Sequence, residues 1–297
     1  MLRGDAAERL VVLDGVRLIE DQDTPSALKQ RLHRHDLFQS LDTLGYECQA
    51  RTLYAEDYGV PQQRRRVFFL ATRLGWDDRL FPRGRYGPVP KPSLEASPYV
   101  HRWKPHGNQR RRHVPTVWSA IGDLPELMNG GCHVGGYAAS ARTAYQRLLR
   151  GGETEVFNHF ARHLEPVNLE RIRHVPEGGN WRDIPFDLLP KGMQRARASD
   201  HTKRYGRLSK KGLCCTVLTK CDPHWGSYIH PTQDRALSAR ELARLQSFPD
   251  HFEFLGLQTE QFEQIGNAVP PLMAAAVGTA VRAHIERNAR QANQGAA

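Results

Sequence analysis

Residues 58–73, YGVPQQRRRVFFLATR, join a positively charged segment directly to an apolar one. The apolar run VFFL is typical of a strand that is buried on both faces. Side chains alternate between the two faces of an extended chain, so Gln62, Arg64 and Arg66 share one face. Their amide and guanidinium groups suit a phosphate or a carbonyl edge. A strand end capped by solvated charge would show the same pattern.

The sequence on the amino-terminal side of this stretch predicts an α/β arrangement. ERLVVLDGV (residues 8–16) contains a short apolar run that indicates a buried strand. Residues 24–45 predict a helix, with Thr24 as its cap, leucines near helical spacing and Gly45 at its end. YECQARTLY (46–54) alternates in polarity and predicts a further strand.

The carboxyl-terminal part of the chain predicts helices. In LSARELARLQSF (237–248), Ser238 and Glu241 form the pattern of a capping box. In QIGNAVPP, Gly266 and Asn267 predict a tight turn whose backbone N–H groups are free to bind a ligand. A simple entry into the next helix is the alternative. That amphipathic helix starts at the two prolines, where a missing N–H costs little.

Positive charge is the main compositional feature of the chain. Lys and Arg outnumber Asp and Glu by 42 to 32, and the isoelectric point is about 9.6. Two stretches, residues 95–123 and 187–222, carry much of the excess, with aromatic and histidine side chains between the bases. Such a surface suits the phosphates of nucleic acid. A solvated basic face is the alternative for either stretch.

The sequence gives no sign of a membrane segment, a disulfide framework or a zinc site. No apolar stretch approaches the roughly 20 residues that cross a bilayer, and the first ten residues carry both signs of charge. The five cysteines have neither paired spacing nor a C-x-x-C motif. We therefore expect a cytoplasmic protein with reduced thiols, no bound metal and no membrane partner.

Three long blocks, in this order, closely resemble the DNA (cytosine-5) methyltransferases. They are YGVPQQRRRVFFLATR, LSARELARLQSFPDHFEF and QIGNAVPPLMAAAVG. Shorter blocks between them are also similar to that family: TVWSAIGDLP, GGNWRDIP, RYGRLSKKGLCCTVLTK and YIHPTQDRALS. The resemblance covers most of the chain from about Thr43 onward.

The resemblance implies a partial doubly wound (Rossmann-like) α/β methyltransferase domain and a smaller, irregular target-recognition domain. Residues 1–85 would be the C-terminal part of the catalytic domain. Residues 86–230 would recognise DNA in the major groove, and residues 231–297 would return as helices to the catalytic domain. The implied reaction moves a methyl group from S-adenosyl-L-methionine to carbon 5 of a flipped-out cytosine in double-stranded DNA, as in a restriction-modification system.

The positions that match the family's motifs carry implied roles. Gln62, Arg64 and Arg66 correspond to the family's contact with the flipped cytosine, and are the expected catalytic residues. The block that closes over the cofactor corresponds to Asn267, Ala268 and Val269. The expected DNA-binding residues are Arg110, Arg111, Arg112, Lys203, Arg204, Arg207, Thr216 and Leu218.

Two early elements of that family have no counterpart in this sequence: the Gly-rich cofactor loop and the Pro-Cys-Gln loop that supplies the nucleophile. Cys48, in the tripeptide ECQ, lacks the proline and lies in a predicted strand, so we do not expect it to be the nucleophile. Asp14 is either a degenerate form of the family's catalytic glutamate or part of an exposed Asp-Gly turn.

These departures lead to an expectation about partners. We expect the C-terminal subunit or fragment of a methyltransferase, inactive alone and completed by a second subunit that carries the cofactor loop and the catalytic cysteine. A catalytically inactive, sequence-specific DNA-binding remnant is the alternative, as is a start assigned too late.

Overall fold

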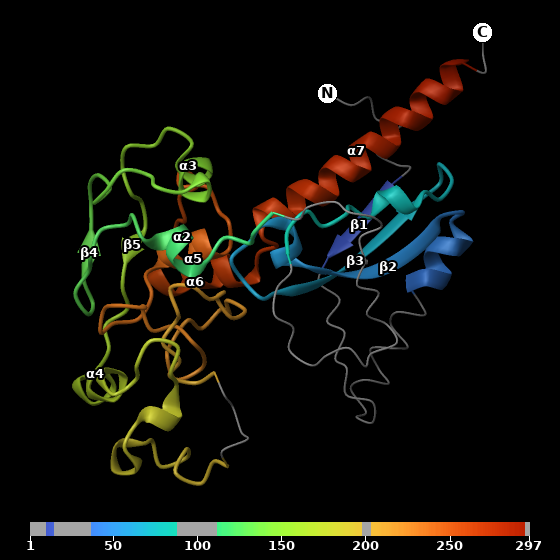
Figure 1. Cartoon of the computed structure of the whole chain (residues 1–297). Coiled ribbons are helices and arrows are strands. Elements are labelled where there is room, and N and C mark those ends of the chain that lie inside the picture. Colours follow the sequence, from blue (N-terminus) through green and yellow to red (C-terminus); the bar gives the residue numbers. More distant parts are fainter. Residues whose placement is uncertain (1–9, 15–36, 88–111, 198–202, 295–297) are drawn as a thin grey trace. The chain divides into compact units, whose positions relative to one another are not determined.

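The computed structural model describes residues 10–14, 37–87, 112–197 and 203–294 (Figure 1). The chain folds into two compact units, each discontinuous in sequence. The boundary between the units falls within the charged segment, between Arg64 and Arg65. The sheet unit comprises residues 1–58, 65–113 and 272–297, and the loop-rich unit comprises residues 59–64 and 114–271.

The central strand of the sheet unit is β3 (Arg65–Thr72). It pairs antiparallel with β1 (Leu10–Asp14) on one side and with β2 (Glu47–Tyr54) on the other. In this register, both Val12 and Gln49 lie opposite Leu70. Residues 67–72 of β3 are all buried, as the apolar run predicts for a central strand. All three strands predicted from the sequence are confirmed.

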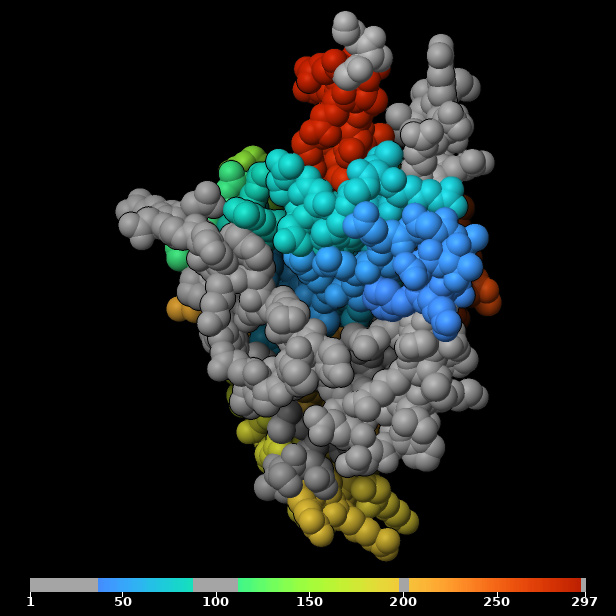
Figure 2. Space-filling model, turned by 90° about the vertical axis from the view of Figure 1, so that its right-hand side faces the viewer, coloured from blue at the N-terminus to red at the C-terminus, as the bar shows by residue number. Residues whose placement is uncertain are grey.

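Helix α7 (Pro271–Gln294) belongs to the sheet unit from residue 272 onward. His284 Nε2 lies 3.4 Å from Thr72 Oγ1, at the end of β3, and anchors the helix beside the sheet. The last described residues of α7, 289–294, are all exposed, and Figure 2 shows this end projecting past the blue and cyan surface. Of the helix predicted over residues 24–45, the described part is helical from 37 to 43.

Two further facts complete the sheet unit. The short 3₁₀ helices η2 (Ala55–Tyr58) and η3 (Asp78–Leu80) follow β2 and β3. No single helix among the described residues is long and apolar enough to cross a bilayer, and α7 meets that test only if it is joined to the preceding helix across their break.

Short helices and two-residue strands build the loop-rich unit, and long irregular connections join them (Figure 1). Its elements are α2 (Val117–Ile121), β4 (Cys132–His133), α3 (Ala144–Arg150), β5 (His159–Phe160), α4 (Pro166–Arg173), η4 (Trp181–Asp183), η5 (Phe186–Leu188), α5 (Ala239–Leu245) and α6 (Gln258–Asn267).

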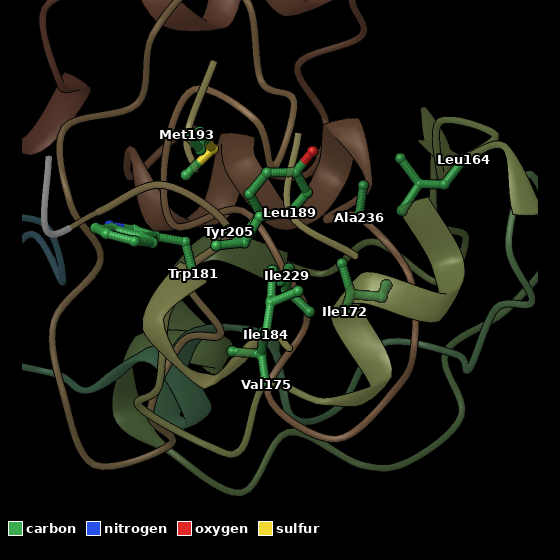
Figure 3. Packing of buried hydrophobic residues seen from close by; sticks show 10 residues of the cluster. All are labelled: Leu164, Ile172, Val175, Trp181, Ile184, Leu189, Met193, Tyr205, Ile229 and Ala236. Atoms are coloured by element: carbon green, nitrogen blue, oxygen red, sulfur yellow. The ribbon is translucent and has the colours of Figure 1, made fainter. Parts of the chain in front are cut away.

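Ten buried apolar residues form a core cluster of this unit (Figure 3). Ile172 of α4 and Trp181 of η4 lie in it together with Tyr205 and Ile229. Burying side chains of this size contributes roughly 1.5–3 kcal/mol each. This burial stabilises connections that lack a continuous hydrogen-bonded ladder. The other members are Leu164, Val175, Ile184, Leu189, Met193 and Ala236.

Helix α5 is buried along its whole length, including its charged residues. The predicted capping box is present, because the Ser238 side chain accepts from Glu241 N and the Glu241 side chain accepts from Ser238 N. Arg244 donates to both carboxylate oxygens of Asp250 (2.9 and 2.6 Å) and to Asp123. Buried charges persist only when they are paired and hydrogen-bonded, and here each arginine of α5 has such partners.

The α/β class expected from the sequence is confirmed, with antiparallel pairing throughout the described strands. The packing units follow different boundaries from the expected functional segments. Residues 231–271 cluster with residues 114–230, and only residues 272–297 cluster with the sheet. The functional division at residues 85 and 230 stays a prediction.

Candidate functional site

Two segments that are far apart in the sequence, residues 61–64 and 214–217, lie side by side in the loop-rich unit. Cys214 N donates to Pro61 O at 2.9 Å, and Gln63 N donates to Cys214 O at 2.8 Å. Thr216 Oγ1 donates to Gln63 O at 2.8 Å. The predicted base-contact segment therefore touches the predicted recognition residue Thr216 directly.

Gln62 is fully buried, and its amide joins two parts of the unit. Its Oε1 accepts from Val217 N at 3.2 Å. Its Nε2 donates to Gln246 Oε1 at 2.8 Å and to Leu245 O at 3.3 Å. Both ends of the amide are thus engaged with protein groups.

Arg64 is only 2% exposed, and its guanidinium binds main-chain carbonyls. Nη1 donates to Val217 O at 2.8 Å, while Nη2 donates to Gly266 O at 2.7 Å and to Ala268 O at 3.1 Å. Gln62 and Arg64 therefore share Val217 as a neighbour, as the alternation along the segment predicts, and Arg64 also binds the two residues that flank Asn267.

Arg66 belongs to the other unit, so the three predicted residues are not all in one body. It is half-buried at the start of β3, opposite Leu53 of β2. Its Nη1 lies 3.5 Å from Arg65 O. Arg65 is exposed, consistent with the opposite direction expected of it.

The predicted cofactor block lies at the end of α6. Gly266 and Asn267 are helical rather than a tight turn, so the expectation of free backbone N–H groups there is wrong. The chain leaves the helix at Ala268, whose backbone is extended. The Asn267 side chain is exposed and Val269 is half-buried. An exposed amide can both donate and accept hydrogen bonds, which suits the polar end of a ligand.

The expected DNA-binding residues have different exposures. Lys203 and Leu218 are exposed, Leu218 by 45%, whereas Arg204 and Thr216 are half-buried. Arg112 is exposed in the sheet unit. Arg110 and Arg111 lie outside the described residues. The exposed members remain predicted DNA contacts.

The expectation that Arg207 binds DNA is wrong. Arg207 is 7% exposed, and its guanidinium donates to the carbonyls of Val175 (2.7 Å) and Ile172 (2.9 Å) and to Asp234 (2.6 Å). A side chain committed to these partners stabilises the fold beside α4 and does not track phosphates. The charge count of its segment gave no means of separating it from the exposed bases.

Two further residues of interest are not predicted from the sequence. Gln246, at the end of α5, accepts from Gln62 and donates to the carbonyls of Ile265 and Ala268. Only long-range packing identifies it. Trp225 is 52% exposed, with the Arg204 guanidinium 5.4 Å from its ring centroid. The interleaving of aromatic and basic residues was the available signal for Trp225.

The thiols of the described residues differ in ionisation and exposure. Burial raises the pKa of Cys48 to about 11, and burial also raises the pKa of Cys221. The hydrogen bond from Cys214 lowers the pKa of Cys215 to about 7, and this bond together with burial raises the pKa of Cys214. Cys215 is nevertheless buried, with only 9% of its surface exposed. Cys132 is exposed.

Comparison with known proteins identifies the family. The family model of the C-5 cytosine-specific DNA methylases matches residues 26–283. The chain belongs to this family. Family members are DNA (cytosine-5)-methyltransferases, which use S-adenosylmethionine.

The chain spans different shares of the length of its individual relatives. DNA (cytosine-5)-methyltransferase 1 of Gallus gallus is 28% identical over 95% of this chain, which spans 22% of that protein. The type II methylase M.HgiDII of Herpetosiphon aurantiacus is 29% identical over 85% of the chain, which spans 60% of that protein.

A solved structure supports the fold of the chain. A prophage-encoded DNA modification methyltransferase (E. coli) is 20% identical and superposes with a TM-score of 0.62. The match covers 93% of this chain and 70% of that protein. At this identity the likeness supports the α/β fold alone.

Proposed function

We propose that the chain supplies the DNA-recognition and base-holding part of a DNA (cytosine-5) methyltransferase. A second subunit supplies the cofactor loop and the catalytic cysteine. The observation that carries this proposal is the joining, inside one unit, of the segment at Gln62 and Arg64, the loop at Val217 and the end of α6. These are the parts that the family's recognition and base-contact blocks would bring together.

Three exposed side chains and the half-buried Arg66 have distinct tasks in the proposed reaction. Leu218 and Lys203 meet the duplex, one through apolar contact and the other through phosphate charge. Arg66 donates to the flipped cytosine, where negative charge develops in the ring. The Asn267 amide binds the polar end of S-adenosylmethionine, which supplies the methyl group as an electrophile.

The cysteines of this chain support an external nucleophile. The attacking species must be a thiolate that the base can reach. Cys48, Cys214 and Cys221 have raised pKa values, and Cys215 is buried. The chain has no Pro-Cys-Gln sequence around any of its five cysteines.

A covalent trap tests the proposal. The chain is purified from its source with the proteins that accompany it, and is incubated with S-adenosylmethionine and duplex DNA containing 5-fluorocytosine. Fluorine cannot leave as a proton does, so the nucleophile stays attached to the base. We expect the trapped peptide to come from an accompanying polypeptide, and no trapped species when this chain is tested alone.

The other outcomes are equally informative. A trapped peptide from this chain, containing Cys215 or Cys132, would refute the external nucleophile. Sequence-specific DNA binding with no trapped species in any fraction would instead support the inactive DNA-binding remnant.

A further inference from the structure

Val217 is held through both of its main-chain polar groups. Its N–H donates to Gln62 Oε1 at 3.2 Å, and its carbonyl accepts from Arg64 Nη1 at 2.8 Å. The Val217 side chain is fully buried. We call residues 214–219 the Val217 loop. Thr216 and Leu218, two of the expected DNA contacts, flank this fixed residue.

The same two side chains also reach the end of α6. Arg64 Nη2 donates to the carbonyls of Gly266 (2.7 Å) and Ala268 (3.1 Å). Gln62 acts through Gln246, whose Nε2 donates to the carbonyls of Ile265 and Ala268. Each side chain therefore joins the Val217 loop to the residues on either side of Asn267.

Close backbone contact makes this connection rigid. A Cβ added at Gly266 would lie 2.5 Å from the carbonyl carbon and oxygen of Leu218 and 2.6 Å from Thr219 N. The loop therefore lies directly on the helix end. The two side chains that point outward from this junction, Leu218 and Asn267, are both exposed.

Burying the charged Arg64 side chain costs free energy. Its burial here indicates that Arg64 fixes the positions of the groups that it binds. A guanidinium keeps its charge when buried, which is expensive unless its donors are satisfied. Three carbonyls accept from Arg64, while Nε has no partner among the described residues. An apolar side chain would fill the space at lower cost, but it could not fix three separate carbonyls.

We propose that Gln62 and Arg64 are positioning residues rather than nucleotide contacts. They fix the Val217 loop against the end of α6, and so set the distance between the DNA-facing Leu218 and the ligand-facing Asn267. This assignment deepens the proposed function and leaves Arg66 as the member of the trio that meets the base.

Hydrogen exchange of the chain itself tests the geometry without relying on the proposed function. Arg64→Lys keeps the charge but cannot span the carbonyls of Val217 and Gly266, and Gln62→Glu keeps the acceptor while losing the donor to Gln246. For both, we expect exchange in residues 214–219 to rise by about tenfold. Gln63→Ala is the control, because Gln63 contacts the loop through its main chain.

Exchange in residues 239–245 monitors the fold of α5 in the same samples. Unchanged exchange in the Val217 loop of both variants would overturn the inference. Two conservative variants are used so that the failure of one to fold leaves the other to decide.

Methyl transfer by the complete enzyme tests whether Arg64 positions the Val217 loop or contacts the nucleotide directly. Selection from a random-sequence duplex library first defines the preferred site. For Arg64→Lys we expect sequence discrimination to fall by about tenfold and KM for DNA to rise. A loss confined to kcat, with normal discrimination and normal loop exchange, would make Arg64 a direct contact and overturn the proposal.

Discussion

Two arginines that are two residues apart differ sharply in environment. Arg64 is 2% exposed and binds three carbonyls, whereas Arg66 is half-buried at the start of β3. The sequence pattern groups them, because alternation shows only that they share a face. Burial then distinguishes a residue that holds the protein together from one that can meet a ligand.

Arg66 is therefore the residue whose loss should affect chemistry most. In the complete enzyme, Arg66→Ala should lower kcat by about 10²-fold, because a donor to developing charge is removed. Non-specific DNA affinity should change by less than about twofold. Arg65→Ala is the matched control and should retain its rate. Single-turnover methyl transfer measures both, and an unchanged rate for Arg66→Ala would remove it from the site.

His230 gives the loop-rich unit a dependence on pH. Its Nδ1 accepts from the backbone N–H groups of Thr232 (3.2 Å) and Gln233 (3.1 Å), so the neutral ring is the bound form. Burial is the main cause that lowers its pKa to about 4, and the charges of Arg235 and Arg207 add to this effect while Glu241 opposes it.

The direction of the pH effect follows from the lowered pKa. An unfolded histidine has a pKa near 6.5, so below that pH the unfolded chain binds a proton that the folded chain does not. The contribution of His230 to the free energy of unfolding is fully present above about pH 6.5. It is lost as the pH falls toward 4, by up to about 3 kcal/mol. Urea unfolding at several pH values should show a shallower decline for His230→Gln. The exposed His251→Gln should retain the slope of the unmodified chain, and an equal slope in both variants would contradict the assignment.

At the scale of elements, α5 is the helix whose surroundings the sequence predicts least well. The sequence predicts its cap correctly, because Ser238 and Glu241 are local to it. Its periodicity predicts one apolar face, yet Arg240 and Arg244 are fully buried. Their partners lie outside the helix, at Asp250 and Asp123. The local sequence pattern does not predict such ion pairs.

Arg244→Met tests how much these buried ion pairs contribute to the free energy of unfolding. The substitution preserves much of the volume but leaves Asp250 and Asp123 buried with fewer partners. We expect a loss of about 3–5 kcal/mol in the free energy of unfolding. Arg147→Met, on the exposed face of α3, should change it by less than about 0.5 kcal/mol. Urea titration measures the free energy of unfolding of both variants. Equal effects of the two substitutions would show that the buried ion pairs add little to stability.

At the scale of the whole molecule, the surplus of positive charge predicts salt-dependent DNA binding. The affinity for duplex DNA should fall log-linearly with salt between about 50 and 200 mM. Lys203→Ala should reduce the slope by about one, because it removes one phosphate contact. Fluorescence anisotropy measures the slope. A flat response, or a slope that Lys203→Ala leaves unchanged, would contradict phosphate tracking at this surface.

The sequence predicts the strands of the sheet and the helices near the carboxyl terminus because their signals are local. It does not predict that packing separates Arg64 from Arg65, placing them in different compact units. Nor does it distinguish the buried Arg207 from the exposed Lys203. Those distinctions depend on contacts between residues that are distant in the chain.

The contact of Gly266 with Leu218 and Thr219 has a consequence for protein engineering. A chimera that imports a foreign recognition segment would have to match the backbone path of residues 218–219 closely, since even a methyl group at Gly266 would collide there. Splice junctions should therefore fall outside residues 214–219. Grafts that retain the native loop should fold, and grafts that cut through it should not.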